Sequence, residues 1–241
     1  MAGVVKVVHS WRCVSDAVVA ALSEPTTDPF VRPILVAPGN AQSRSLLQSL
    51  ARRHGIAAGI DTTTPLGLRE RLEEDLLGIK RENDPWQPGP LALRICRIIE
   101  NNPPGFEVVS AHLEASRRQG VPRATWTTAR QAADAICALA RDSHDVLNAW
   151  AAGAAPTSHK GDTDLAGDPL DPARAWWAPL WRTLLAEPCH VPDPVSRHQL
   201  LVDAILTQSR SEPPIVWFSS TTTAQHDVSF AEALSASHDV T

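Results

Sequence analysis

Short apolar runs alternate with amphipathic stretches over the first third of the chain. The β-branched run at residues 4–8 and the run at 34–36 each predict a buried strand, because short continuous apolar runs are typical of strands covered on both faces. The stretch "GIAAGID" at 55–61 predicts a third, shorter strand. A helical pattern follows each strand after a short connection. This order favours a parallel sheet covered by helices.

Capping residues and apolar spacing predict the helices between these strands. Ser10 is a candidate N-cap for a helix that ends near Leu22, and Thr64-Pro65 supplies the N-cap and first turn of a later helix. The apolar faces recur at helical spacing, with Leu46, Leu47 and Leu50 in one helix and Leu68, Leu72 and Leu76 in the next.

From Leu91 to about Gly153 the sequence carries only helical signals. The predicted helices include an apolar stripe of Leu91, Ile95, Ile98 and Ile99, and the segments 106–116 and 124–141. Residues 151–172 are rich in Ala, Gly, Asp and Pro and predict a solvated loop. Helical patterns resume at 173–187 and at 196–208, where Ser196 is a candidate cap.

A strand at 215–218 and a helix through Phe230 and Leu234 resume the α/β pattern. The last residues, "HDVT", predict the start of another strand, so the sheet looks truncated at its C-terminal end. The predicted organisation is an α/β domain whose first part spans 1–80, a helical insertion at 81–210, and a returning strand and helix at 211–241.

Composition narrows the function classes. The 241 residues carry a net charge of -5, which argues against a free, non-specific DNA binder but leaves a local basic face open. The 4 cysteines are widely spaced without a CxxC pair, so we expect buried or incidental thiols and neither a metal site nor a disulfide framework. No apolar run approaches the roughly 18 residues that span a membrane. We expect a cytoplasmic chain.

The segment "APGNAQSRS" at 37–45 follows a strand, where nucleotide-binding proteins place a phosphate loop. A working loop needs GxxxxGK[ST], with a Lys that reaches the β- and γ-phosphates. Here only Gly39 is present, Pro38 removes an N–H, and Arg44-Ser45 is a poor substitute for Lys-Ser. The segment predicts either a plain strand–helix connection or a helicase-like domain that lost its ATP site. An active P-loop ATPase or helicase is the less favoured alternative.

Seven stretches, in the same order, resemble a known family. They are residues 8–22, 28–61, 131–140, 146–150, 173–185, 196–206 and 213–234. Of these, 28–61 is the most specific in order and length. Together they resemble the N-terminal region of the exodeoxyribonuclease V gamma chain, the RecC subunit of the RecBCD helicase–nuclease.

The resemblance implies a fold and a function. The fold would be a superfamily 1, RecA-like helicase domain that has lost its ATPase motifs and performs no chemistry of its own. The chain would need no cofactor, since partner subunits use the ATP and magnesium. Its partners would be single-stranded and duplex DNA and the beta and alpha subunits, which are RecB-like and RecD-like. It would guide the 3′ strand during double-strand-break repair by homologous recombination.

The resemblance also implies site residues. Asn40, Gln42, Arg44, Asp134 and Arg197 match positions that contact DNA in the family. The chain departs from the family pattern at Thr64, Glu70, Cys137 and Ser143, the last with Arg141 nearby. Recognition of the family's hotspot sequence is therefore not expected. Because of these departures and the truncated sheet, an orphan fragment without an independent role is a further alternative.

Three other groups of residues are candidates for DNA contact. Trp176, Trp177 and Trp181 could stack on bases, but their apolar neighbours favour core packing. Arg52, Arg53 and His54 could meet phosphates, but basic residues also suit an exposed helix C-terminus. The densest basic region, which contains Arg117, Arg118, Arg123 and Arg130, is either a DNA or partner contact or, as we expect more, a solvated face.

Overall fold

The protein is a mostly helical α/β chain. Its structure, a computed structural model, describes residues 10–23, 30–153, 175–207, 213–219 and 225–237. The strands within these described residues form one small, three-stranded parallel sheet, with two strands from the first third of the chain and one from its last part. The chain forms two compact units, residues 1–80 with 199–241, and residues 81–198. We call them the sheet unit and the helical unit and describe each by itself.

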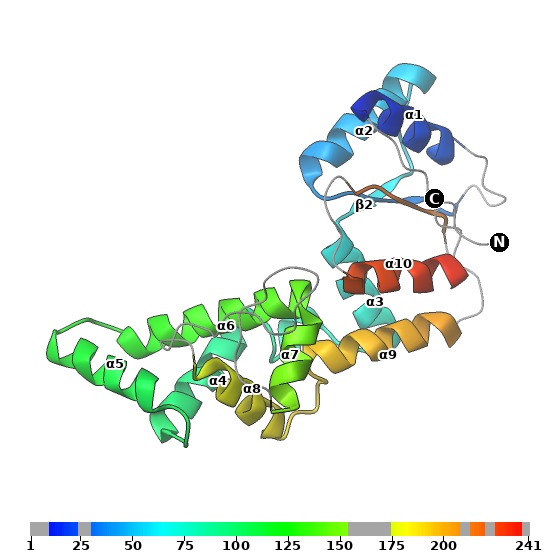
Figure 1. Ribbon diagram of the computed structural model, residues 1–241. Helices are drawn as coiled ribbons and strands as arrows, with labels where there is room; N and C mark the ends of the chain where they lie inside the picture. The colour runs from blue at the N-terminus through cyan, green and yellow to red at the C-terminus, as the bar shows by residue number, and fades with distance from the viewer. Residues whose placement is uncertain (1–9, 24–29, 154–174, 208–212, 220–224, 238–241) are drawn as a thin grey trace. The chain divides into compact units, whose positions relative to one another are not determined.

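The elements follow the predicted alternation (Figure 1). The sheet unit contains α1 (Trp11–Leu22), β1 (Ile34–Val36), α2 (Asn40–His54), β2 (Asp61–Thr63), α3 (Pro65–Leu77), β3 (Ile215–Trp217) and α10 (Gln225–Ser237). The helical unit contains the 3-10 turn η1 (Arg81–Asn83), α4 (Pro88–Asn101), α5 (Glu107–Arg118), α6 (Ala124–Asp142), α7 (His144–Ala151) and α8 (Trp177–Ala186). Helix α9 (Pro194–Thr207) starts in the helical unit and ends in the sheet unit.

Strand β1 is the centre of the sheet, with the order β2-β1-β3 and both pairings parallel. Ile34 pairs with Asp61 on one side and with Ile215 on the other. Each β1 residue is at most 4% exposed, which explains why the run is wholly apolar. The predicted parallel sheet is therefore confirmed.

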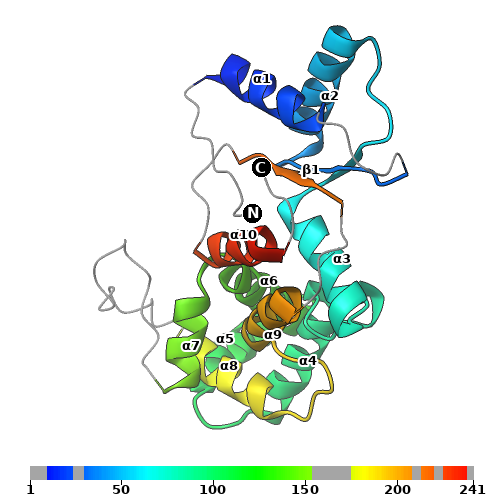
Figure 2. The same ribbon diagram turned by 90° about the vertical axis from the view of Figure 1, so that its right-hand side faces the viewer.

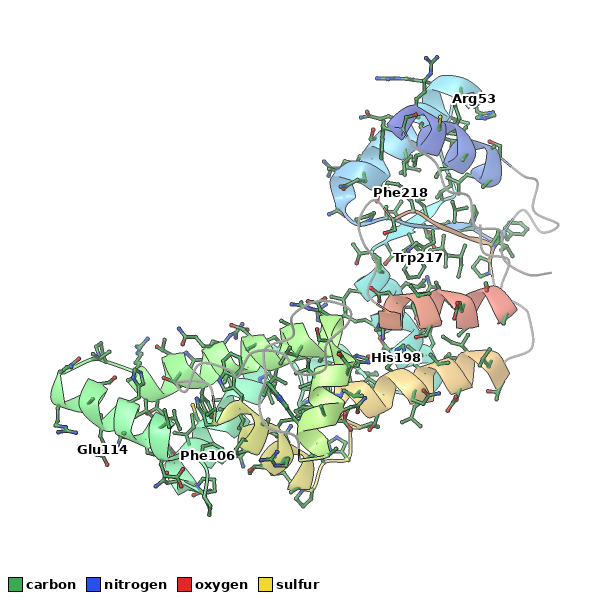
Figure 3. The ribbon with its side chains drawn as sticks, viewed as in Figure 1. Arg53, Phe106, Glu114, His198, Trp217 and Phe218 are labelled. Carbon is green, nitrogen blue, oxygen red and sulfur yellow. The ribbon has the colours of Figure 1, made fainter. Side chains whose placement is uncertain are left out.

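Successive residues of β1 face opposite sides of the sheet and enter two separate cores. Ile34 and Val36 pack with α3, α9 and α10, whereas Leu35 packs with α1 and α2. The same division continues in β3, where Trp217 meets Phe230 and the next residue, Phe218, meets Trp11 on the other face (Figure 3). Helices thus cover both faces of the sheet (Figure 2).

Side-chain caps fix two helix starts that the sequence predicts. The Ser10 hydroxyl accepts a hydrogen bond from the Cys13 backbone N–H at 3.2 Å, and Thr64 accepts one from Gly67 at 3.0 Å. A Cβ at Gly67 would lie 2.6 Å from the Thr63 hydroxyl oxygen, so a larger residue in this first turn would force the Thr63 side chain to move. Both predicted caps are confirmed.

The sequence misplaces one strand and one cap. The predicted strand at 55–61 is wrong, because Gly55 and Gly59 have φ values of 80° and 72°, which no extended strand allows; pairing with β1 begins only at Asp61. Ser196 lies inside α9 and is not its cap. The Asp193 carboxylate accepts from the Val195 and Ser196 N–H groups and caps the helix instead.

Other predicted segments lie outside the described residues. These are the strand at 4–8, the final strand at 238–241 and most of the loop at 151–172. The predicted boundaries of the helical insertion, 81–210, stay a prediction.

The core of the helical unit forms around α4 and α6. The predicted stripe Leu91, Ile95, Ile98 and Ile99 is at most 4% exposed, and it packs beside small residues of α6, which let the two helices approach closely. Paired aromatic rings extend this core, with Trp86 beside Trp181 and Phe106 beside Trp176. The expected core packing of Trp176 and Trp181 is confirmed.

Replacement of the Thr64 cap tests the start of α3. We expect Thr64→Ala to lower the free energy of unfolding by about 1 kcal/mol, because the Gly67 N–H loses its acceptor. Thr64→Ser keeps a capping hydroxyl and should retain most of the stability. Urea unfolding followed by circular dichroism measures both variants. Equal losses in the two would contradict a capping role.

Candidate functional site

The connection between β1 and α2 is the first element of the candidate site. It consists of only three residues, Ala37 to Gly39, between the end of β1 and the start of α2 at Asn40. Gly39 is extended, with φ −170° and ψ 169°, and provides no side-chain cap. A phosphate loop places four residues between two glycines before its Lys, so this connection is too short to wrap a phosphate chain in that way.

This connection lies at the carboxyl edge of the sheet. The three parallel strands end at Val36, Thr63 and Trp217, so the residues that follow them share one edge. Ligands of open α/β sheets bind outside this edge, beside the helix that follows a central strand. The predicted residues Asn40, Gln42 and Arg44 occupy the first turns of α2 at this position.

Asn40, Gln42 and Arg44 present polar groups that suit nucleic acid. Asn40 and Arg44 are exposed and lie four residues apart, so they share one side of α2. The Gln42 Oε1 atom lies 3.2 Å from the position that a Gly39 Cβ would take, so this amide folds over the turn. Amides and guanidinium groups can hydrogen-bond base edges or pair with phosphates.

The charge of α2 favours an anionic ligand. The helix contains three arginines, one histidine and no acidic residue. Without a side-chain cap, the backbone N–H groups of its first turn have no acceptor inside the helix, and the positive end of the helix dipole is at the same place. The turn therefore offers donors and positive potential, but no catalytic group.

Asp134, the fourth predicted residue, lies in the helical unit on α6. Its carboxylate is exposed, and both of its oxygens lie 3.1 Å from Nε of Arg130 one turn earlier. An exposed pair of this kind contributes little to stability and can exchange partners. The carboxylate is accessible to a ligand.

Arg197, the fifth predicted residue, is buried in the helical unit at the start of α9. Its Nη1 and Nη2 atoms each lie 2.9 Å from a different oxygen of Asp84, and its side chain is 7% exposed against 3% for Asp84. Asp84 also accepts hydrogen bonds from the Trp86 backbone and the Gln87 side chain. Through this ion pair, Arg197 connects the start of α9 to the segment between η1 and α4.

The pair with Arg197 determines the protonation of Asp84. Burial alone would raise the pKa of this carboxyl, but the hydrogen bonds and positive charge of Arg197 outweigh it and hold the pKa of Asp84 below its ordinary value. Asp84 therefore stays ionised, and the pair is a structural ion pair.

Cys137 occupies the position where the resembled family has an acid. Its Sγ lies 3.5 Å from the Trp86 carbonyl oxygen, and burial raises the pKa of the thiol to about 11. Such a thiol stays protonated at neutral pH and is not a nucleophile. Cys137 therefore supplies neither a negative charge nor a reactive sulfur.

At the exposed C-terminal end of α2, His54 and Ser23 have the residue types of a catalytic His–Ser pair but not its chemistry. His54 Nε2 lies 3.0 Å from the Ser23 hydroxyl, but this hydroxyl donates to the Val19 carbonyl oxygen and is not activated by the imidazole. Arg53 pairs with Asp16 at 3.3 Å, and Arg52 is exposed. The interpretation of residues 52–54 as an exposed helix end is confirmed.

The five predicted residues divide between the units. Asn40, Gln42 and Arg44 come together in one turn of the sheet unit, while Asp134 and Arg197 belong to the helical unit and have separate partners. Sequence reasoning missed Asp84, because 113 residues separate it from Arg197 and no local spacing connects them.

The described part of the chain contains no group of three or more His, Cys, Asp or Glu side chains that could hold a metal ion. In the same residues, no helix has both the length and the apolar character needed to cross a membrane.

Comparison with known proteins identifies relatives along almost the whole chain. The family described as "RecC, N-terminal domain" matches residues 8–241. The protein named RecBCD enzyme subunit RecC from Mycobacterium tuberculosis (strain CDC 1551 / Oshkosh) is 28% identical over 250 residues, which cover 94% of this chain. The protein of the same name from Mycolicibacterium smegmatis is 26% identical over 242 residues, again 94% of the chain. The matched regions are 20% and 19% of these relatives, so the chain spans about a fifth of their length.

Removal of the Arg197 charge tests its structural role. We expect Arg197→Met to lower the free energy of unfolding by about 3–5 kcal/mol, because Asp84 is left charged and buried without its partner. The double variant Asp84→Asn/Arg197→Met should lose less. Arg130→Ala, which breaks an exposed pair, should cost under about 1 kcal/mol. Urea unfolding compares the three. A loss for Arg197→Met no larger than that for Arg130→Ala would contradict the structural role.

Acid titration gives a second test of the same pair. Because the folded pKa of Asp84 is depressed, its contribution to stability is complete above the unfolded pKa of about 4 and disappears as pH falls through the folded value. The stability advantage of the unsubstituted chain over Asp84→Asn/Arg197→Met should therefore shrink below about pH 4. Thermal melting from pH 7 to pH 3 measures it. A constant advantage over that range would show that Asp84 does not titrate with a depressed pKa.

Proposed function

The chain belongs to the RecC N-terminal domain family, and on this basis we propose that it is a non-catalytic, DNA-handling portion of a RecC-like subunit of a RecBCD-type helicase–nuclease. The observation that carries the proposal is the family match over residues 8–241. Relatives named as subunits of this enzyme align with 94% of the chain and support the same assignment.

We propose further that the sheet unit is an inactive, superfamily 1 helicase-like domain of RecA type. A central parallel strand, a connection to a helix at its carboxyl end, and helices on both faces support a scaffold built for nucleotides. The three-residue connection and the lack of a Lys in it argue that ATP is not hydrolysed here. ATP and magnesium would then be used by the partner subunits and not by this chain.

In this proposal, DNA contacts the first turns of α2. Asn40, Gln42 and Arg44 supply amide and guanidinium donors at the carboxyl edge of the sheet, and α2 has no acidic residue to repel phosphates. Asp134 is an accessible acceptor for a base amino group in the helical unit. Arg197 acts differently, because its buried pair with Asp84 supports a positioning role and not a direct contact.

The proposed setting is double-strand-break repair by homologous recombination. The names of the relatives support assembly with RecB-like and RecD-like subunits. Guidance of the 3′-ended strand is the part that we propose for this chain within such an assembly. Where the family has an acid, Cys137 carries no charge, so the sequence preference of this chain would differ from the family's.

Substitutions along α2 test the DNA contact. We expect Arg44→Ala, combined with Asn40→Ala and Gln42→Ala, to weaken binding of a duplex with a 3′ single-stranded tail at least about tenfold, because each specific contact contributes about 1–3 kcal/mol. Fluorescence anisotropy with a labelled tail measures the affinity. Arg52→Ala, at the other end of α2, is the matched control and should leave the affinity nearly unchanged. Equal weakening by both variants would mean that the charge of α2 matters and the turn does not.

A nucleotide assay tests the loss of the ATP site. We expect 5 mM ATP with magnesium, a concentration on the order of the cellular one, to leave the melting temperature unchanged, since a ligand raises stability only when it binds the folded state. Released phosphate should stay at the level of buffer alone. A melting shift that Arg44→Ala abolishes would establish nucleotide binding at this turn and overturn the proposed loss.

A further inference from the structure

The α5–α6 hairpin carries a basic surface outside the candidate site. From residue 115 to residue 133 the sequence contains four arginines and no Asp or Glu, in a chain whose net charge is -5. Three of these arginines and one tryptophan lie around the turn that joins α5 to α6. We call this group the hairpin tip, and it consists of Arg117, Arg118, Arg123 and Trp126.

Backbone hydrogen bonds bring the hairpin tip together. Helix α5 ends at Arg118, and Gly120 adopts a positive φ of 70°. The Gly120 N–H donates to the Arg117 carbonyl and the Val121 N–H to the Ser116 carbonyl, which closes the helix in a Schellman turn. Helix α6 then starts at Ala124. The last turn of α5 and the first turn of α6 therefore lie at the same end of the hairpin (Figure 1).

The arginines of the hairpin tip are available to a ligand. Arg118 and Glu114 are 4.0 Å apart with side chains 78% and 68% exposed, so this pair is weak (Figure 3 labels Glu114 on α5). Arg117 and Arg123 are exposed, and no acidic side chain in the described residues lies within ion-pair distance of either. Within the part of the chain that the structure describes, Arg117 and Arg123 thus have no acidic partner.

Trp126 adds an aromatic surface beside these cations. It is 39% exposed although tryptophan is usually largely buried, and it follows Arg123 by three residues in the first turn of α6. Arg130 lies one turn later on the same face. Arg130 is paired with Asp134, so the tip combines the accessible indole ring with the positive charge of Arg123 and the α5 arginines.

The backbone at Arg123 gives no structural reason for an arginine. Its φ is 56°, in the left-handed region that favours glycine, and its side chain makes no capping hydrogen bond to α6. A positive charge at a helix N-terminus is also disfavoured by the helix dipole. Stability alone would favour glycine here, so an arginine at this position lowers stability, which supports a binding role for its guanidinium.

We propose that the hairpin tip binds single-stranded nucleic acid, with phosphates paired to Arg117, Arg118 and Arg123 and a base stacked on Trp126. Proteins that bind single strands combine basic side chains along the nucleic-acid backbone with exposed aromatic rings on which bases stack. A duplex supplies the phosphates but keeps its bases stacked, and an acidic protein segment supplies no base for the indole ring. The proposal does not rest on the role of the β1–α2 turn.

Binding of a labelled oligothymidylate of about 20 nucleotides, a size that spans one or two single-strand sites, tests the proposal on the complete chain by fluorescence anisotropy. Arg117→Ala/Arg123→Gly should weaken binding at least about tenfold and reduce the slope of log K against log salt by about 1.4, the value for two lost phosphate contacts on a single strand. Trp126→Ala should weaken binding roughly 5- to 100-fold, as expected for a lost stacking contact, and Trp126→Phe should restore most of it. Arg97→Ala, an exposed arginine on α4, is the matched control and should change little.

Three further measurements separate the outcomes. Arg123→Gly should keep or raise the melting temperature, because glycine relieves the positive φ; weakened binding is then not unfolding. A duplex of the same length should be insensitive to Trp126→Ala. Variants of Asn40, Gln42 and Arg44 are measured in parallel, so failure at one surface is distinguished from failure at the other. The proposal is overturned if the unsubstituted chain does not bind the oligonucleotide, if the tip variants bind it as the unsubstituted chain does, or if Trp126→Ala affects duplex and single strand equally.

Discussion

The burial of β1 on both faces is the constraint on which the sheet unit depends. Because side chains alternate along a strand, Ile34 and Val36 enter one core and Leu35 enters the other. Segments far apart in sequence, α3 and α10 on one face and α1 and α2 on the other, are held together by these three residues. The same central position puts the β1–α2 connection at the middle of the carboxyl edge, where open α/β sheets bind ligands.

The sequence predicts those parts of the fold whose signals are local. Local patterns predict the β1 run and the apolar stripe of α4, because only one arrangement buries their apolar side chains. They also predict the caps Ser10 and Thr64, because each hydroxyl residue directly precedes a helical pattern. The strand expected at 55–61 was misplaced, because its apolar residues lie between two glycines with positive φ, and the sequence does not report φ. The Asp193 cap was missed since Ser196 offered an equally plausible signal.

For the candidate site, the sequence predicts the kind of residue and not its partner. Arg44 and Arg197 look equivalent in sequence, but one is exposed on α2 and the other is buried against Asp84. An arginine whose charge is already matched in a low-dielectric setting is unlike one that faces solvent, since only the second can exchange its partner for a phosphate. The same distinction separates Arg197 from Arg117 and Arg123, for which composition alone favoured a plain solvated face. The structure adds the exposed Trp126 and the positive φ of Arg123.

In the proposed function, the β1–α2 turn keeps the ligand-binding position of a nucleotide-binding scaffold and serves DNA instead. Photochemical cross-linking tests this most directly. The chain would be irradiated with a 3′-tailed duplex that carries 4-thiothymidine along its tail, and the linked peptides would be identified by mass spectrometry. We expect cross-links within residues 38–45, at the carboxyl edge of the sheet. Cross-links in the sheet unit that avoid this turn and cluster at the opposite end of α2, around Arg52 and Arg53, would contradict it.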